Sequence, residues 1–389
     1  MNNVILIGLV SFFADLSTEM VYPLIPLYLT TVFGATPALV GVIEGIAESL
    51  ASLLKVFSGY ITDKYRKKKS VAFVGYAAGL VYKLALIIAG SWLGILAARL
   101  IDRFGKGIRT APRDVLVSES CDADKLGHSF GIHKALDMAG SAAGILIAFF
   151  IMTAWQGEYA YKQLFLLSCI PAIASLFMFV FIRETGERCE VSEPLHIVQG
   201  LKHLDGRLKL YLAVVFLFTL GNSSNVFLLL KAGNVGFDPA SVVLLYFLYN
   251  TVSSLFAVPF GKRSDRIGRK RLLVAGYFTF AIAYTGFAWA PNKIIIIAAF
   301  ALYGIFTAMT AGVERAFVSE IAPKELKGTM LGLHSTIVGI ALLPASVIAG
   351  LLWNAFGSMV PFALGAGLSL ASALILAFGL PQKTENSSS

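Results

Sequence analysis

Acidic residues lie inside the first long apolar run of this chain, where charged side chains are rare. Asp15 and Glu19 are four residues apart, so a helix would place both carboxyl groups on one face. Two carboxylates close together in a medium of low dielectric cannot both ionise cheaply, so one of them is suited to take up and release a proton. The alternative is a static ion pair with an Arg or Lys of a neighbouring run, and we favour the proton carrier.

A second acidic pair with the same spacing lies in the next apolar run. Glu44 and Glu48 could line a substrate cavity, because charged residues inside a bilayer commonly mark a functional site. They could equally form ion pairs with Lys83 or Arg99 of the two following runs. The residues leave both interpretations open.

Three arginines, Arg103, Arg109 and Arg113, recur along the run between residues 92 and 117. Guanidinium groups match the oxygens of carboxylates and phosphates, so these side chains could attract an anionic substrate. Because buried charges are usually partnered, we favour ion pairs within the protein. The candidate partners are Asp102, Asp114 and Asp137.

Other kinds of chemistry find little support in the residues. No group of His, Cys, Asp or Glu has the spacing of metal ligands, and no nucleophile stands in a pattern with a base and an orienting group. We therefore expect neither a metal, another cofactor nor an enzymatic activity.

Composition indicates where these charged residues lie. The chain of 389 residues is 57% hydrophobic and 14% charged, whereas soluble proteins contain about a quarter charged residues. It is therefore expected to cross the lipid bilayer repeatedly. The net charge of +9 does not indicate nucleic acid, because the basic residues gather in short loops between apolar runs, as in cytoplasmic loops. Three scattered cysteines are too few for a disulfide framework.

A helix that spans a membrane needs about 20 apolar residues, and the chain contains twelve such runs. The first has no basic leader and carries Asp15 and Glu19, so we expect it to be retained rather than cleaved. Pro23 and Pro26 have no backbone N–H to donate and should bend this first helix. Both termini fall on the side of the basic loops. The runs are 4–29, 37–58, 71–90, 92–117, 128–153, 162–182, 209–231, 239–260, 271–290, 293–318, 326–353 and 358–380.

The second half of the chain repeats the first. Gly59 and Asp63 correspond to Gly261 and Asp265 at an offset of 202, and His133 corresponds to His334 at an offset of 201. A repeat of this length predicts two parallel six-helix bundles in an all-α membrane protein. We expect bundles at 1–182 and 209–380, a cytoplasmic linker at 183–208 and a disordered cytoplasmic tail at 381–389.

The repeated stretch also carries a resemblance. Gly-x-x-x-Asp followed by basic residues, between the second and third runs of each half, resembles motif A of the major facilitator superfamily. In the first copy, Arg66 stands where the motif has a glycine, and in the second copy Gly268 keeps it. The resemblance covers the whole chain. It implies alternating access around a substrate site between the two halves.

Further blocks support the same resemblance. Arg103 to Ala111 resembles motif B, in which the arginine, here Arg103, is linked to proton coupling. Gly140 and Gly144 keep the spacing of motif C of the drug/proton antiporters, but Ile145 stands in place of its proline. The blocks 15–23 and 105–114 resemble a bacterial subgroup described as efflux proteins. They imply a prokaryotic inner (plasma) membrane protein.

Motif A implies a gate at the cytoplasmic end, which holds the outward-facing state and breaks when the protein opens inward. The ends of the fourth and tenth runs carry opposite charges at matching positions, which fits such a gate. The basic loops would also fix the orientation of the chain. The expected gate residues are Gly59, Asp63, Lys64, Arg113, Asp114, Gly261, Asp265, Arg266, Glu314 and Arg315.

Together these features predict a monomeric secondary transporter of a small molecule, driven by protons, with export favoured over import. His133 and Asp137 share a helix face and could relay protons, although a packing role common to His133 and His334 is favoured for the histidine. The alternatives are an uncoupled facilitator of a small organic anion and, in another class, a membrane enzyme or sensor. The expected proton-coupling residues are Asp15, Glu19, Arg103, His133 and Asp137. The expected cavity residues are Tyr22, Glu44, Glu48, Arg109, Asn222, Asn225, Tyr246, Tyr249 and Asn250.

Overall fold

The computed structural model describes residues 3–65, 68–120, 126–155, 157–183, 206–321 and 327–380, and no strand occurs among them. Only the backbone is described for 55–65, 126–131 and a few residues near 111, 118, 319 and 327–332. The first half contains α1 (Asn3–Val21), η1 (Tyr22–Leu24), α2 (Ile25–Phe33), α3 (Pro37–Tyr65), α4 (Lys68–Ile88), α5 (Trp92–Ser118), α6 (Leu126–Ala154) and α7 (Gly157–Val180). The second half contains α9 (Gly206–Gly221), α10 (Val226–Asn234), α11 (Pro239–Ile267), α12 (Arg269–Trp289), α13 (Lys293–Thr310), α14 (Val313–Ile321), α15 (Lys327–Phe356) and α16 (Met359–Gly379).

These helices confirm the predicted all-α membrane protein. Eleven helical segments among the described residues are long and apolar enough to cross a membrane. The remaining predicted span is α5, which is 27 residues long but carries the charged residues discussed above. The expected tail lies outside the described residues, and so does the expected linker, except for Arg183 and residues 206–208, which belong to α9.

The basic stretches were expected to be loops, but the helices continue through most of them. The backbone of α3 is helical to Tyr65, and α11 is helical to Ile267. Between α11 and α12 a single residue, Gly268, turns the chain with φ of +92°, which glycine adopts without the strain that other residues would meet. The second copy of the repeated stretch is therefore a sharp helix-to-helix turn.

The first spanning segment of each half is interrupted at the same place in the repeat. In the first half, η1 separates α1 from α2 next to Pro23, which has no N–H to donate, so the predicted bend is confirmed. In the second half, residues 222–225 separate α9 from α10, at an offset of about 200 from η1. There the Ser224 hydroxyl accepts a hydrogen bond from the backbone N–H of Val226, which offers the backbone an alternative to helix.

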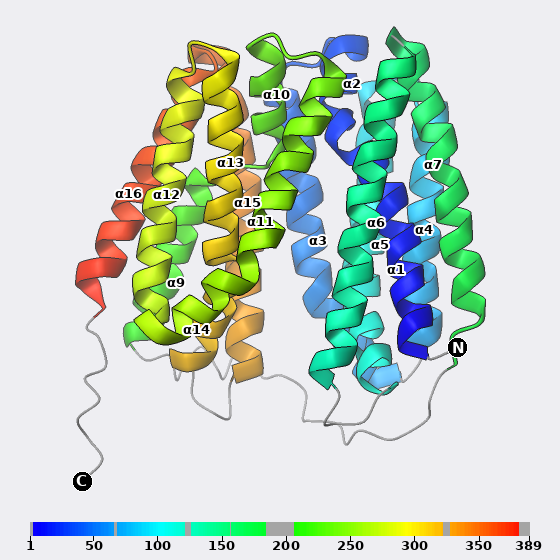
Figure 1. The fold of residues 1–389 in the computed structure, drawn as a ribbon, viewed down its shortest axis with the longest axis horizontal. Helices are drawn as coiled ribbons and strands as arrows, with labels where there is room; N and C mark the ends of the chain where they lie inside the picture. Colours follow the sequence, from blue (N-terminus) through cyan, green and yellow to red (C-terminus); the bar gives the residue numbers. More distant parts are fainter. Residues whose placement is uncertain are drawn as a thin grey trace.

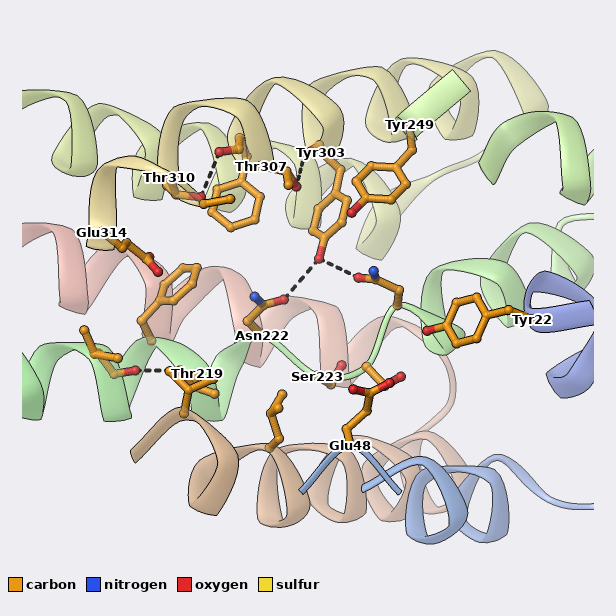
Figure 2. Close-up of a pocket in the computed structure, with 18 residues that line it drawn as sticks. Tyr22, Glu48, Thr219, Asn222, Ser223, Tyr249, Tyr303, Thr307, Thr310 and Glu314 are labelled. Atoms are coloured by element: carbon orange, nitrogen blue, oxygen red, sulfur yellow. Dashed lines mark hydrogen bonds between the residues drawn. The ribbon is translucent and has the colours of Figure 1, made fainter. Parts of the chain in front are cut away.

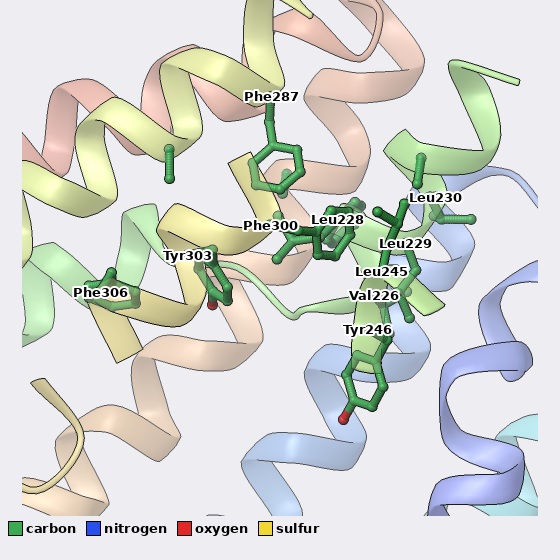
Figure 3. Close-up of a cluster of buried hydrophobic side chains, with 14 of the residues drawn as sticks. Val226, Leu228, Leu229, Leu230, Leu245, Tyr246, Phe287, Phe300, Tyr303 and Phe306 are labelled. Carbon is green, nitrogen blue, oxygen red and sulfur yellow. The ribbon is translucent and has the colours of Figure 1, made fainter. Parts of the chain in front are cut away.

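The two halves stand side by side as separate bundles (Figure 1). One end of the molecule, here called the basic end, contains the start of α1 and the turns that precede α4 and α12, with their lysines and arginines. The short helices α2 and α10 lie at the opposite end. A cluster of buried apolar side chains packs α10 against α11 and α13 and includes Leu228, Leu245 and Phe300 (Figure 3).

The halves touch mainly through α3 against α15 and α6 against α11. A Cβ atom added at Gly41 would lie 2.3 Å from the carbonyl oxygen of Ser346, so glycine is what permits this close approach. The backbone N–H of Ala38 donates to Oδ1 of Asn354 at 3.3 Å. These contacts lie in the parts of α3 and α15 that are away from the basic end.

Candidate functional site

A cavity of about 310 Å³ lies between the two halves, at the level where the interrupted segments break (Figure 2). Only Tyr22 of η1 and Glu48 of α3 come from the first half. The rest of the wall comes from α9, the 222–225 break, α11, α13, α14 and α15. Its other lining residues are Val215, Phe218, Thr219, Asn222, Ser223, Ser224, Asn225, Tyr249, Tyr303, Phe306, Thr307, Thr310, Ala311, Glu314, Val338 and Leu342.

Hydrogen-bonding side chains converge at the middle of this cavity. The Tyr303 hydroxyl lies 2.7 Å from Oδ1 of Asn225 and 3.3 Å from Oδ1 of Asn222, as Figure 2 shows. The Tyr249 ring lies 5.3 Å from the Tyr303 ring. The break in the helix thus presents two amides whose N–H groups can donate to a solute, beside aromatic faces on which a ring can pack.

Five of the nine residues that were expected to line a substrate cavity lie in the wall of this one. Tyr22, Glu48, Asn222, Asn225 and Tyr249 line the cavity. Three other expected residues lie elsewhere. Tyr246 packs behind the wall with its ring 5.8 Å from the rings of both Tyr22 and Tyr249, Asn250 donates to the Tyr246 carbonyl, and Arg109 lines a smaller pocket of the first half.

Glu44 corrects the prediction. Its carboxylate accepts two hydrogen bonds from the Arg99 guanidinium, one of them from Nε at 2.8 Å, and both side chains are 1% exposed. Of the two interpretations that the residues left open, the ion pair with Arg99 is the one that the structure shows. Burial behind the cavity wall removes Glu44 from contact with a solute.

The cationic helix α5 is neutralised by neighbouring carboxylates, as favoured from the sequence. Arg103 pairs with Glu48 at 3.1 Å, and Asp102 lies 3.6 Å from Arg99 and 3.7 Å from Arg103. At its other end Arg113 pairs with Asp114 at 2.9 Å. An ionised group that is buried without a counter-charge is costly, so these pairs are what make the helix compatible with a bilayer.

Of the expected proton-coupling residues, Asp15 and Asp137 meet between α1 and α6, whereas Arg103 pairs with Glu48 of α3. Asp15 lies 3.7 Å from the Arg109 guanidinium and within hydrogen-bonding reach of Asp137, which also pairs with Lys134 at 2.7 Å. Two carboxyl groups can share a hydrogen bond only when one of them carries a proton. The sequence had not brought Asp15 and Asp137 together, because they come from different helices.

Glu19 and His133 occupy separate positions around this group. Oε2 of Glu19 is buried and has no hydrogen-bond partner among the described residues. Nε2 of His133 lies 2.9 Å from the Ser11 hydroxyl, which in turn lies 3.3 Å from the Tyr76 hydroxyl. His133 is thus held by hydrogen bonds that run through the hydroxyl groups of Ser11 and Tyr76.

Among the expected gate residues, Arg113, Asp114 and Asp265 form ion pairs within their own halves. Asp265 pairs with Arg269 at 3.1 Å, and Arg269 pairs with Glu320 at 2.8 Å. Arg266 and Arg315 lie at the same end, on α11 and α14, as does the backbone of Gly261. The side chains of Asp63 and Lys64, like Gly59 beside them, fall outside the described side chains.

Glu314 is the gate residue whose position differs most from expectation, because it lines the cavity. Three cavity residues that the sequence reading missed, Tyr303, Thr307 and Thr310, lie on α13. Their spacing of four and three residues is that of one helix face, and this signal was available in the sequence.

Comparisons with known proteins agree with this architecture. The sequence model of the Major Facilitator Superfamily matches residues 7–232 and 210–389. An uncharacterised MFS-type transporter of Methanocaldococcus jannaschii is 37% identical over 382 residues, which are 97% of this chain and 94% of that protein.

Two solved structures share the fold. The nucleoside transporter NupG superposes with a TM-score of 0.82 at 11% identity, over 97% of this chain and 98% of that one. A D-xylose–proton symporter superposes with a TM-score of 0.77 at 17% identity, over 97% of each chain.

Proposed function

Because the chain belongs to the major facilitator superfamily of membrane transporters, we propose that it moves a small solute across the plasma membrane by alternating access, driven by protons. The observation that carries this proposal is the cavity at the matching breaks of the two halves. Paired interruptions at corresponding positions of a repeat commonly mark the substrate site of a secondary transporter.

We assign the structure to an inward-facing state. Basic loops favour the cytoplasmic side, so we propose that the basic end, with the start of α1 and the end of α16, faces the cytoplasm. Among the described side chains, the close contacts between halves, such as Gly41 against Ser346, lie away from that end. The cavity wall extends towards it as far as Glu314 on α14. In the outward-facing state, the gate residues at the basic end would exchange their present partners for partners across the halves.

Protons are proposed to bind at the Asp15–Asp137 pair. This pair lies between α1 and α6. Helix α1 contacts η1, which carries the cavity residue Tyr22, and α6 contacts α11 of the second half. Arg109 lies 3.7 Å from Asp15 and can stabilise its ionised form after the proton leaves. Glu19, one turn further along α1, is a second acceptor on the same face.

The direction of transport rests on the resemblance to bacterial efflux proteins, and export is therefore proposed. An uncoupled facilitator is the second candidate, because the Asp15–Arg109 contact could serve as a static ion pair. A facilitator of organic anions is less well supported, since the arginines of α5 are occupied by carboxylates of the protein.

The experiment is proton movement in proteoliposomes that contain an internal pH dye, across a panel of organic cations, organic anions and divalent metals. Wild type is compared with Asp15→Asn, Glu19→Gln and Asp137→Asn. Glu158→Gln is the control, because Glu158 lies on α7, half exposed, in a pair with Lys162. Proton flux that one solute class triggers, and that Asp15→Asn and Asp137→Asn abolish, is expected. Solute flux without a pH change, unaltered in these variants, would make the protein a facilitator.

A further inference from the structure

Two carboxylates line the cavity, and they differ in how they are neutralised. Glu48 lies 3.1 Å from the Arg103 guanidinium, so its charge is balanced inside the protein. Nε2 of His334 lies 4.0 Å from Glu314, and a histidine carries a charge only when it is protonated. Arg315, the next residue, also attracts the Glu314 carboxylate, but its side chain is exposed, so water screens its charge. None of the described residues that line the cavity is a lysine or an arginine.

Glu314 is held so that its carboxylate faces the cavity. It lies in the first turn of α14, where the helix dipole favours negative charge. The Tyr277 hydroxyl of α12 donates to its Oε1 at 3.3 Å, which leaves Oε2 towards His334. The side chain is 19% exposed, and Figure 2 shows it at one end of the cavity, away from Tyr22.

The repeat shows that this acid is specific to the second half. At an offset of 201, Glu314 corresponds to Arg113, while Tyr277 and His334 correspond to Tyr76 and His133. Each half therefore keeps a tyrosine and a histidine, whereas the Arg113–Asp114 pair of the first half becomes Glu314–Arg315, with the two signs exchanged, in the second half. Arg113 pairs with its neighbour Asp114 at 2.9 Å and does not line the cavity, whereas Glu314 does.

Aromatic faces complete the surroundings of this carboxylate. Phe218 and Phe306 line the same part of the cavity, with ring centroids 5.7 Å apart, and Tyr303 lies 5.4 Å from Phe306. Aromatic rings attract cations through their faces, and the attraction grows where water is excluded. An anionic solute would meet the negative charge of Glu314 and the negative faces of these rings.

We infer that the cavity binds an organic cation, with its ammonium group at Glu314 beside Phe218 and Phe306 and its ring or polar part at Tyr303 and the Asn222–Asn225 break. This substrate class rests on the proposed transport function. A cavity of about 310 Å³ falls at the lower end of the range for drug-sized ligands, so the cation is expected to be small.

The test is binding to purified protein in detergent by titration calorimetry, which needs neither transport nor a proton gradient. Three probes share one phenol ring and differ in the para group: trimethylammonium, tert-butyl and sulfonate. The first two have the same shape, so their difference reports charge alone. Each is titrated into wild type, Glu314→Gln and the control Glu158→Gln, and the melting temperature confirms that every variant is folded.

The expected result is binding of the ammonium probe at least tenfold tighter than that of the tert-butyl probe, with no binding of the sulfonate. Glu314→Gln should weaken the ammonium probe about tenfold and leave the tert-butyl probe unchanged, whereas Glu158→Gln should change neither. Equal affinity for the two isosteres, tighter binding of the sulfonate, or full affinity in folded Glu314→Gln would overturn the inference. Because binding is measured without transport, a facilitator with intact ammonium binding would refute proton coupling and leave this assignment standing.

Discussion

Removal of the Glu44 charge should test whether the buried ion pair with Arg99 holds the first half together. Both side chains are 1% exposed and share two hydrogen bonds. Breaking a buried pair by removing one partner costs about 3–5 kcal/mol, because an uncompensated charge stays behind. Asp102 lies 3.6 Å from Arg99 and compensates in part, so Glu44→Gln should fall at the lower end, about 3 kcal/mol.

This free energy translates into a measurable change in melting temperature. An unfolding entropy of about 2.1 cal/mol/K per residue gives a chain of 389 residues roughly 0.8 kcal/mol per degree. Glu44→Gln should therefore lower the melting temperature by about 4 °C. The assay is thermal unfolding in detergent with a thiol-reactive dye, since the thiol of Cys169 is buried and becomes reactive on unfolding.

Two comparisons make the result decisive. Glu158→Gln breaks an exposed pair with Lys162, whose net contribution should be too small to resolve. The double variant Glu44→Leu/Arg99→Met removes both charges, so it should melt above Glu44→Gln. Two results would contradict this reasoning: equal melting temperatures of Glu44→Gln and Glu158→Gln, or a double variant that melts below Glu44→Gln. In either case the Glu44–Arg99 pair does not stabilise the first half by neutralising a buried charge.

Two further predictions concern the cavity and the contact between halves. Tyr303→Phe removes the hydroxyl that lies 2.7 Å from Asn225. It should raise the solute concentration for half-maximal transport about tenfold, with little change in melting temperature. A roughly tenfold fall in the maximal rate, with the half-maximal concentration unchanged, would contradict a binding role. Gly41→Val should abolish most transport without loss of protein from the membrane, because its Cβ would lie 2.3 Å from the Ser346 carbonyl oxygen. Gly367→Val, on α16 with no atom within 4 Å of an added Cβ, is the matched control and should transport as wild type; equal loss in both would show that helix propensity, not packing between halves, is responsible.

The sequence predicted the fold well because the bilayer constrains it strongly. Runs of apolar residues, their number and the repeat between halves were sufficient for twelve segments in two bundles. The bend at Pro23 followed from its missing N–H. The break at 222–225 was missed, because Asn and Ser are compatible with an apolar span, and only tertiary contacts decide whether they leave the helix.

The site was predicted less completely because it depends on distances between helices. Glu44 and Glu48 are four residues apart and share a helix face. Glu44 is nevertheless buried in an ion pair with Arg99, whereas Glu48 pairs with Arg103 and lines the cavity. Spacing along a helix cannot distinguish these outcomes, which depend on which arginine of α5 comes opposite each turn. In the same way, Asp15 was predicted to act with Glu19, whereas Asp137 of α6 is the carboxyl that it meets.

The two halves divide the chemistry unequally, and this division limits how they can be coupled. Most of the buried charged side chains lie in the first half, and most of these form ion pairs. Most of the cavity wall, in contrast, belongs to the second half. Tyr22 lies where the two meet, with its ring 5.2 Å from the Arg99 guanidinium, 5.4 Å from that of Arg103 and 5.8 Å from the Tyr246 ring. A solute in the cavity contacts Tyr22 and Glu48 directly, and through them the pairs of α5. Under the proposed proton coupling, a change in the protonation of the first half would therefore reach the solute through the electrostatics of two side chains, without a rearrangement of the cavity wall in the second half.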